Sequence, residues 1–181
     1  VSAKVVMPQT ADPIRISGCE EMGAEVILTN DIASASEILQ EIAKAESRTI
    51  LHPFNDLNMA YGAASCGAEF IEDMPEADVF IIPVGGGGLI AGMAAAIKHF
   101  NPAIKVIGVE PQGANSLRRS FLSGRPESLD KVETIADSLG APSALAESFQ
   151  LARANVDQVI EIEDKVMSQT MLQMRDRLNL F

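Results

Sequence analysis

Four consecutive glycines join an apolar run to a helical pattern near the middle of the chain. Residues 79–98 have the sequence VFIIPVGGGGLIAGMAAAIK. Residues 79–84 are nearly all apolar, which predicts a central strand that is buried on both faces of its sheet. Apolar side chains recur at helical spacing over residues 88–100, which predicts a helix. A strand that passes through glycines into a helix is typical of the α/β fold class.

The rest of the 181-residue chain repeats this alternation of short apolar runs and helical patterns. The repetition predicts parallel sheets flanked by helices. Further strands are expected at residues 4–7, 25–28, 49–51, 105–109 and 158–162. Further helices are expected at residues 13–22, 57–73, 115–122, 143–152 and 165–178, together with one that a capping box of Ser34 and Glu37 opens.

Three local patterns refine this assignment. Asp56 is expected to cap the helix that follows it, and Gly124 to end the helix before it. The last helix carries a stripe of apolar side chains that predicts a core-facing surface. The stripe consists of Met167, Met171, Met174 and Leu178.

The polar turn HPFND at residues 52–56 interrupts the alternation, so we expect two α/β domains, a smaller one at 1–57 and a larger one at 58–181.

The composition argues against several classes of function. Twenty-five acidic and 14 basic residues give a formal net charge of −11, whereas a nucleic-acid groove requires clustered Lys and Arg. No apolar run reaches the roughly 18 residues of a membrane span, and no signal peptide is visible. The two cysteines, Cys19 and Cys66, fit a reducing compartment. The sequence therefore predicts a cytoplasmic protein without nucleic-acid or membrane partners.

The glycine run predicts an anion site. The first N–H groups of a helix have no intrahelical partner, and glycine lets an oxyanion approach the backbone closely. The alternative is a tight turn that only requires a positive φ. If a phosphate binds, a dinucleotide is one source, since Gly86, Gly88 and Ala91 fit G-x-G-x-x-A and Glu110 ends the next predicted strand. The four glycines are Gly85, Gly86, Gly87 and Gly88.

Several segments resemble the serine/threonine dehydratase family of pyridoxal-phosphate enzymes, which also includes serine racemases. They are VVMPQTADPIRISGCEEMGAEVIL (5–28), HPFNDLNMAYGAASCGAE (52–69), residues 79–98, KVIGVEPQGANSL (105–117) and TIADSLG (134–140). The resemblance covers essentially the whole chain. It implies a type II pyridoxal-phosphate fold similar to the β subunit of tryptophan synthase, here incomplete, and it favours pyridoxal phosphate over a dinucleotide.

The resemblance also implies a site and a reaction. The four glycines and Leu89 match the family's phosphate-binding loop, and Ser138 stands close to the cofactor where the family commonly has glycine. The substrate implied is a small hydroxy amino acid, from which β-elimination removes water and ammonia; a serine racemase-like activity is the alternative.

A divalent cation is not expected, although one candidate ligand is present. In family members that bind a cation, the acid of the VEP segment is a ligand together with a carboxylate six residues later. Glu110 matches the first position, but Ser116 occupies the second. Glu110 is therefore the one candidate metal ligand that the resemblance offers.

The lysine that bonds covalently to the cofactor lies, in this family, in a Ser-Phe-Lys motif upstream of the segment at residues 5–8. None of the lysines of this chain stands in such a motif. The resemblance therefore implies an internal portion of a longer protein, without the N-terminal lysine segment and the C-terminal end, and inactive alone. The lysines are Lys4, Lys44, Lys98, Lys105, Lys131 and Lys165.

Three hypotheses remain open. The chain belongs to an enzyme that missing segments complete, it is a phosphate- or nucleotide-binding module without chemistry, or it is a subunit with a structural role. An incomplete first unit leaves apolar strand residues in the first third of the chain uncovered, which predicts a homo-oligomer. The residues expected at that interface are Val5, Val6, Val26, Ile27 and Leu28.

Overall fold

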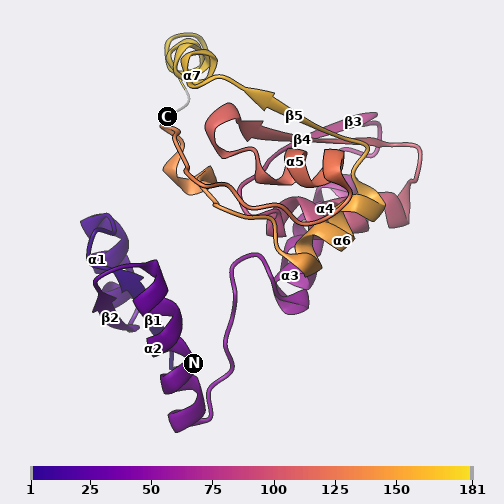
Figure 1. Ribbon diagram of the computed structural model, residues 1–181. Coiled ribbons are helices and arrows are strands. Elements are labelled where there is room, and N and C mark those ends of the chain that lie inside the picture. Colours follow the sequence, from indigo (N-terminus) through magenta and orange to yellow (C-terminus); the bar gives the residue numbers. More distant parts are fainter. Residues whose placement is uncertain (1, 180–181) are drawn as a thin grey trace. The chain divides into compact units, whose positions relative to one another are not determined.

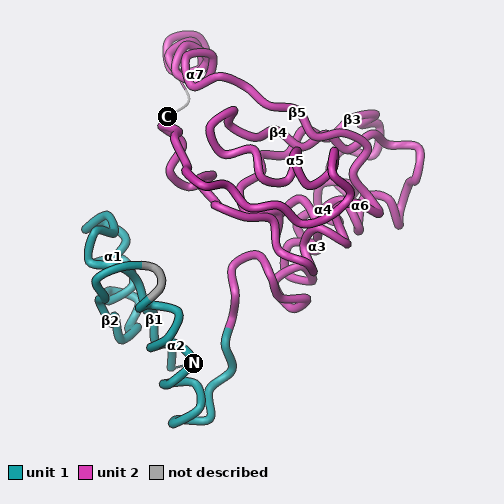
Figure 2. Tube along the Cα trace, viewed as in Figure 1, with its two compact units in different colours: residues 1–50 teal, residues 51–181 magenta. Residues whose placement is uncertain are grey.

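The computed structural model describes residues 2–179, without the side chains of Ile32 and Ala33. The chain divides into two compact units, residues 1–50 and 51–181 (Figure 2). The division therefore falls before the HPFND turn rather than after it. None of the described helices has both the length and the apolar run that a membrane span requires.

Unit 1 is a small parallel α/β unit. Strand β1 (Lys4–Pro8) pairs in parallel with β2 (Glu25–Thr29), with Val5 opposite Val26. The strands are connected by α1 (Pro13–Glu21), and α2 (Ile32–Glu46) follows β2 (Figure 1). The strands at residues 4–7 and 25–28 are confirmed.

Two predictions for this part of the chain are wrong. Helix α2 begins at Ile32, and Asp31 caps it by accepting a hydrogen bond from Ser34 N at 2.7 Å. Ser34 therefore lies inside the first turn and opens no capping box, because the carboxylate of Asp31 is already the acceptor. Residues 49–51 form no strand, since they lie at the junction of the two units and pair with no described strand.

Unit 2 contains a parallel sheet in the order β3-β4-β5, made by Val79–Pro83, Lys105–Pro111 and Gln158–Ile162. Its helices lie close to the predicted positions, except that α6 begins three residues later than expected. Asp56 caps α3 by accepting from Asn58 N at 2.8 Å, and Gly124 ends α5 with a φ of 77°. The helices are α3 (Leu57–Asp73), α4 (Gly88–Phe100), α5 (Ser116–Ser123), α6 (Ala146–Asn155) and α7 (Asp164–Leu178).

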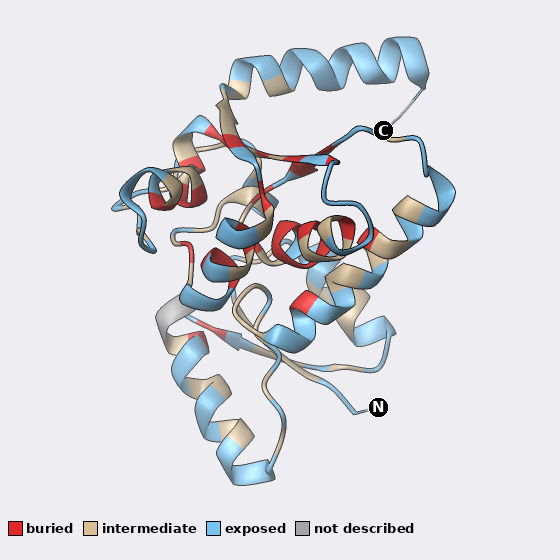
Figure 3. Ribbon diagram, turned by 90° about the vertical axis from the view of Figure 1, so that its right-hand side faces the viewer, coloured by how far each residue is buried: buried red, intermediate tan, exposed pale blue. Residues whose placement is uncertain are grey.

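The core of unit 2 lies on one face of this sheet, where α4 is buried against it (Figure 3). The prediction that residues 79–84 are buried on both faces is wrong. Phe80 and Ile82 face the core, whereas Val79 is 45% and Ile81 69% exposed. Strand β3 is an edge strand of the described sheet, and its alternation of exposed and buried residues is that of a strand covered on one face only.

The predicted core-facing stripe of α7 is also wrong. Met171 is 65% exposed and Leu178 62% exposed, and α7 contains no buried residue. The helix stands apart from α3, α4 and α6 beyond the sheet (Figures 1 and 3). The apolar stripe of α7 therefore packs against no surface among the described residues.

Helices α3 and α4 pack with their backbones in close contact, because small residues line the contact. A Cβ on Gly92 of α4 would meet the carbonyl oxygen of Ala60 and the side chain of Ala63 on α3. A Cβ on Gly67 of α3 would lie 2.8 Å from the carbonyl oxygen of Met93. This contact fixes α4, and with it the glycine loop that precedes α4.

The same substitution at two helical glycines should therefore have opposite effects on stability. Gly92→Ala is expected to lower the free energy of unfolding by about 1–3 kcal/mol, because the two backbones must move apart. Gly62→Ala, on the open side of α3, meets no atom within 4 Å and should raise that free energy by about 0.5–1 kcal/mol. Urea unfolding of both variants checks this, and equal effects would contradict the packing described.

Candidate functional site

The glycine loop connects the carboxyl end of β3 to the start of α4. Val84 continues the ladder of the sheet, donating to the carbonyl of Val109 at 2.9 Å. Gly87 is the N-cap of α4, with a φ of 87° that L side chains rarely adopt. The chain thus turns from strand to helix within four residues, and glycine is required at position 87 for this turn.

The N–H groups of this loop have no acceptor within the described chain. No hydrogen bond among the described residues uses the N–H of Gly85, Gly86, Gly87 or Gly88, and no side chain caps α4. The first helical donors and the positive end of the helix dipole therefore meet at this loop.

Three other helix N-termini of unit 2 receive a side-chain acceptor, whereas α7 has no side-chain cap. Asp56 caps α3, and Asn55 Oδ1 accepts from Glu147 N in the first turn of α6 at 3.2 Å. The carboxylate of Glu110 accepts from Leu117 N and Arg118 N at the start of α5. The start of α4 differs from these three, since its first N–H groups have no acceptor among the described residues.

The structure places the backbone of Ser138 next to the glycine loop. A Cβ on Gly85 would lie 3.3 Å from the carbonyl oxygen of Ser138 and 3.2 Å from Leu139 Cα. Ser138 belongs to a short 3₁₀ helix, Asp137–Leu139, and its side chain is exposed. Leu89, the last residue of the predicted site, is 45% exposed at the start of α4.

The HPFND segment is the part of this site that the sequence reasoning did not assign. The ring of Phe54 occupies the place that a Cβ on Gly86 would take, and Pro53 O would lie 2.9 Å from a Cβ on Gly88. His52 Nδ1 accepts from Phe54 N at 3.3 Å and from Asn55 N at 3.1 Å, which holds the turn. The sequence signals for this segment were its place directly before a capped helix and its inclusion in the family-like segment 52–69.

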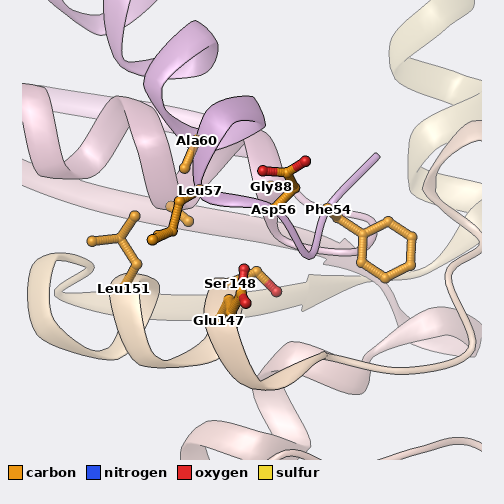
Figure 4. Close-up of a pocket in the computed structure, with 9 residues that line it drawn as sticks. Phe54, Asp56, Leu57, Ala60, Gly88, Glu147, Ser148 and Leu151 are labelled. Atoms are coloured by element: carbon orange, nitrogen blue, oxygen red, sulfur yellow. The ribbon is translucent and has the colours of Figure 1, made fainter. Parts of the chain in front are cut away.

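A small pocket lies beside the loop between α3, α4 and α6 (Figure 4). Its polar side chains are those of Asp56, Glu147 and Ser148, and the rest of its lining is apolar. Ser148 Oγ lies 3.1 Å from the carbonyl oxygen of Gly86, so this pocket adjoins the back of the loop. The lining residues are Phe54, Asp56, Leu57, Ala60, Gly88, Ala91, Glu147, Ser148 and Leu151.

Glu110 is fully buried at the end of β4. Its two carboxylate oxygens accept from Leu117 N at 2.9 Å and from Arg118 N at 2.7 Å. Burial raises the pKa of Glu110 to about 7, and the two backbone N–H donors oppose this shift. Glu110 thus acts as a buried cap of α5.

The position that would provide the second ligand beside Glu110 holds Ser116 rather than a carboxylate. Ser116 offers an alcohol where a second carboxylate would be needed, and its buried Oγ has no hydrogen-bond partner among the described residues. The described residues also contain no group of three or more His, Cys, Asp or Glu side chains that could hold a metal ion.

Comparison with known proteins decides the family. The family model described as "Pyridoxal-phosphate dependent enzyme" matches residues 1–181. The chain belongs to the pyridoxal-phosphate dependent enzymes. This confirms the resemblance, and the cofactor of the family is pyridoxal phosphate.

The proteins that the chain is similar to include a dehydratase, an ammonia-lyase and a serine racemase. The phenylserine dehydratase of Ralstonia pickettii is 40% identical over 180 residues, which are 99% of this chain and 55% of that protein. The L-threonine ammonia-lyase of Thermotoga maritima is 34% identical over 95% of this chain and 43% of that protein. Maize serine racemase superposes with a TM-score of 0.95 at 29% identity, covering 99% of this chain and 55% of the racemase.

These matches confirm the type II pyridoxal-phosphate fold. They also show that the chain spans about half the length of the relatives it matches. The glycine loop fits the family cofactor on structural grounds, because it offers free backbone donors at a helix N-terminus and a positive φ at Gly87.

The buried Glu110 should make stability depend on pH. Its pKa is raised above the ordinary value of 4.5, so the stability contributed by its protonated form is present below pH 4.5 and is lost as the pH rises through about 7. The loss amounts to about 3 kcal/mol at most, at about 1.4 kcal/mol per pKa unit. The difference in unfolding free energy between the parent and Glu110→Gln should shift by this amount across the range.

Urea unfolding at a series of pH values measures this difference. Glu69→Gln removes an exposed carboxyl group on α3 and should follow the parent curve in parallel. A Glu110→Gln curve that also stays parallel to the parent between pH 4.5 and 7.5 would show that Glu110 does not titrate in this window.

Proposed function

We propose that the glycine loop binds the phosphate of pyridoxal phosphate through the backbone N–H groups of Gly85, Gly86, Gly87, Gly88 and Leu89. The observation that carries this proposal is the contrast between helix N-termini. Side chains of the chain itself accept hydrogen bonds from the first turns of α3, α5 and α6. The backbone N–H groups that lead into α4 have no acceptor among the described residues. A phosphate dianion provides acceptor oxygens and the negative charge that the helix dipole favours.

The reaction we propose for the full-length protein is β-elimination of water from a hydroxy amino acid, after which hydrolysis of the resulting imine gives a 2-oxo acid and ammonia. The relatives named phenylserine dehydratase and threonine ammonia-lyase support this choice. When bound, pyridoxal phosphate supplies an electron sink that makes the proton on the substrate α-carbon acidic. The residues of this chain anchor the phosphate and hold the ring in place, with Ser138 beside the loop.

None of the lysines among the 181 residues stands in the motif that holds the family's covalently bound lysine. Several of these lysines also have other partners. Lys98 Nζ donates to the carbonyl of Ile104 at 2.7 Å and lies 2.8 Å from Asp157. Lys4 bonds Glu46 and Glu25. We therefore propose that this chain alone performs no elimination.

A serine racemase-like activity is the second candidate. The observation in its favour is the superposition on maize serine racemase with a TM-score of 0.95. Racemisation and elimination both begin with loss of the α-proton, and they differ in whether the proton returns or the β-hydroxyl leaves. Both candidates require the same phosphate anchor.

We further propose a homo-oligomer in the cytoplasm. Unit 1 has a sheet of only two strands, so each strand has an unpaired edge. Large apolar side chains are exposed around it, among them Ile14, Met22 and Leu28. Cys19 and Cys66 are free thiols, as in a reducing compartment.

The phosphate proposal predicts different effects for two glycines that share a positive φ. Gly87→Ala should weaken binding of pyridoxal phosphate at least tenfold, because it distorts the loop whose donors hold the anion. Gly124→Ala places the same strain at the end of α5, where a Cβ meets no atom within 4 Å, and should leave the affinity unchanged. Calorimetric titration measures both.

Pyridoxal without its phosphate is the ligand control. The parent chain should bind pyridoxal phosphate and not pyridoxal, since the proposed contacts go to the phosphate. Turnover of L-threonine by this chain should stay at the rate of the free cofactor. Equal binding of the two compounds, or equal loss in both glycine variants, would overturn the loop as the phosphate anchor.

The oligomer is tested by light scattering at micromolar concentration. The parent chain should have a mass that is a multiple of 19.3 kDa. Leu28→Lys on the exposed side of β2 should lower this mass, because a charge at a buried contact is costly. Leu122→Lys, at an equally apolar exposed position of α5, should not. A monomeric parent would overturn this part of the proposal.

A further inference from the structure

A side chain from α6 holds the carbonyl of Gly86. Ser148 Oγ lies 3.1 Å from Gly86 O and 3.2 Å from Leu145 O. Ser148 is only 5% exposed, so its hydroxyl proton has two carbonyl acceptors and little access to water. The contact links residues that are 62 positions apart in the sequence.

This contact determines the direction of one of the loop's N–H groups. In a planar trans peptide, the carbonyl and the following N–H point in opposite directions. The peptide between Gly86 and Gly87 directs its oxygen toward Ser148, so the N–H of Gly87 points away from α6.

Two neighbouring glycines would otherwise let this peptide turn over. Residues without a Cβ impose little steric barrier to such a rotation. A reversed peptide would present its carbonyl oxygen to the bound anion, which is repulsive. Phe54 restricts the movement of Gly86 from another direction, because its ring occupies the place of the missing Gly86 side chain. Figure 4 shows Phe54 and Ser148 around the start of α4.

We propose that Ser148 is a positioning residue of the phosphate site. Its hydroxyl holds the Gly86–Gly87 peptide in the orientation that directs the N–H of Gly87 toward the phosphate, and the ring of Phe54 keeps Gly86 in place. Ser148 itself does not touch the cofactor. This inference rests on the proposed role of the glycine loop.

The experiment compares two variants of the 181-residue chain that have the same shape. Ser148→Thr keeps a hydroxyl group, and Ser148→Val replaces it by a methyl group. Calorimetric titration with pyridoxal phosphate should give a dissociation constant for Ser148→Thr within about threefold of the parent. Ser148→Val should bind about tenfold more weakly, the effect of one lost hydrogen bond.

The matched control is Ser65→Ala on α3. Ser65 Oγ also donates to a glycine carbonyl, that of Gly62, at 2.7 Å. Its removal should leave the affinity for pyridoxal phosphate unchanged. If Ser148→Val does not fold, Ser148→Ala replaces it, with the same tenfold expectation and rescue by Ser148→Thr.

The outcomes separate the two claims. Tight binding by the parent together with equal affinities of the Thr and Val variants would overturn the role of Ser148 and leave the phosphate site intact. A parent that binds pyridoxal phosphate no better than pyridoxal would overturn the phosphate site, and the inference with it. Weak binding by the Val variant alone supports both.

Discussion

A helix must find acceptors for its first N–H groups, and this requirement organises the second unit. The capping aspartate of α3 accepts from the first turn of that helix. The first turn of α6 donates to an asparagine side chain of the HPFND turn, and the first turn of α5 donates to a buried glutamate. Helix α4 begins after four glycines without any such acceptor. Side chains of the protein thus meet this need at three helices of the unit. Helices α4 and α7 begin without a side-chain cap, and of these two only α4 begins at a run of glycines that follows a strand of the sheet.

Close packing makes this open position rigid. The loop lies between Phe54 on one side and the backbone of Ser138 and Leu139 on another, while Ser148 holds one of its carbonyls. The helix that follows is itself fixed by its glycine contact with α3. A cofactor phosphate bound there would be held by a backbone that has little freedom to move, which is what orientation of a reacting ring requires.

The sequence predicted most of the elements because their signals are local. The strand at Gln158–Ile162 and the helices at Leu57–Asp73 and Gly88–Phe100 have the predicted limits. Apolar spacing and caps within a few residues suffice for this. Whether a face is buried does not depend on local sequence alone. The prediction of burial was wrong for Val79, for Ile81 and for the stripe of α7, because spacing does not reveal whether a partner surface is present.

The glycine loop could be predicted as an anion site, whereas its supporting residues could not. Ser148 lies 62 residues and Phe54 lies 32 residues from Gly86, and only the fold brings them together. Glu110 shows the same limit. Its place at the end of a predicted strand is compatible with a ribose hydroxyl as its partner, and the structure instead gives its carboxylate the N-terminus of α5.

The central claim is that the backbone donors before α4 bind a phosphate group. Amide ¹H–¹⁵N spectra of the labelled chain, recorded during titration with inorganic phosphate at constant ionic strength, test it most directly. The account predicts saturable shifts centred on the amides of Gly85, Gly86, Gly87, Gly88 and Leu89, with chloride causing none. Shifts that are absent from these amides, or that centre elsewhere in the chain, would contradict it.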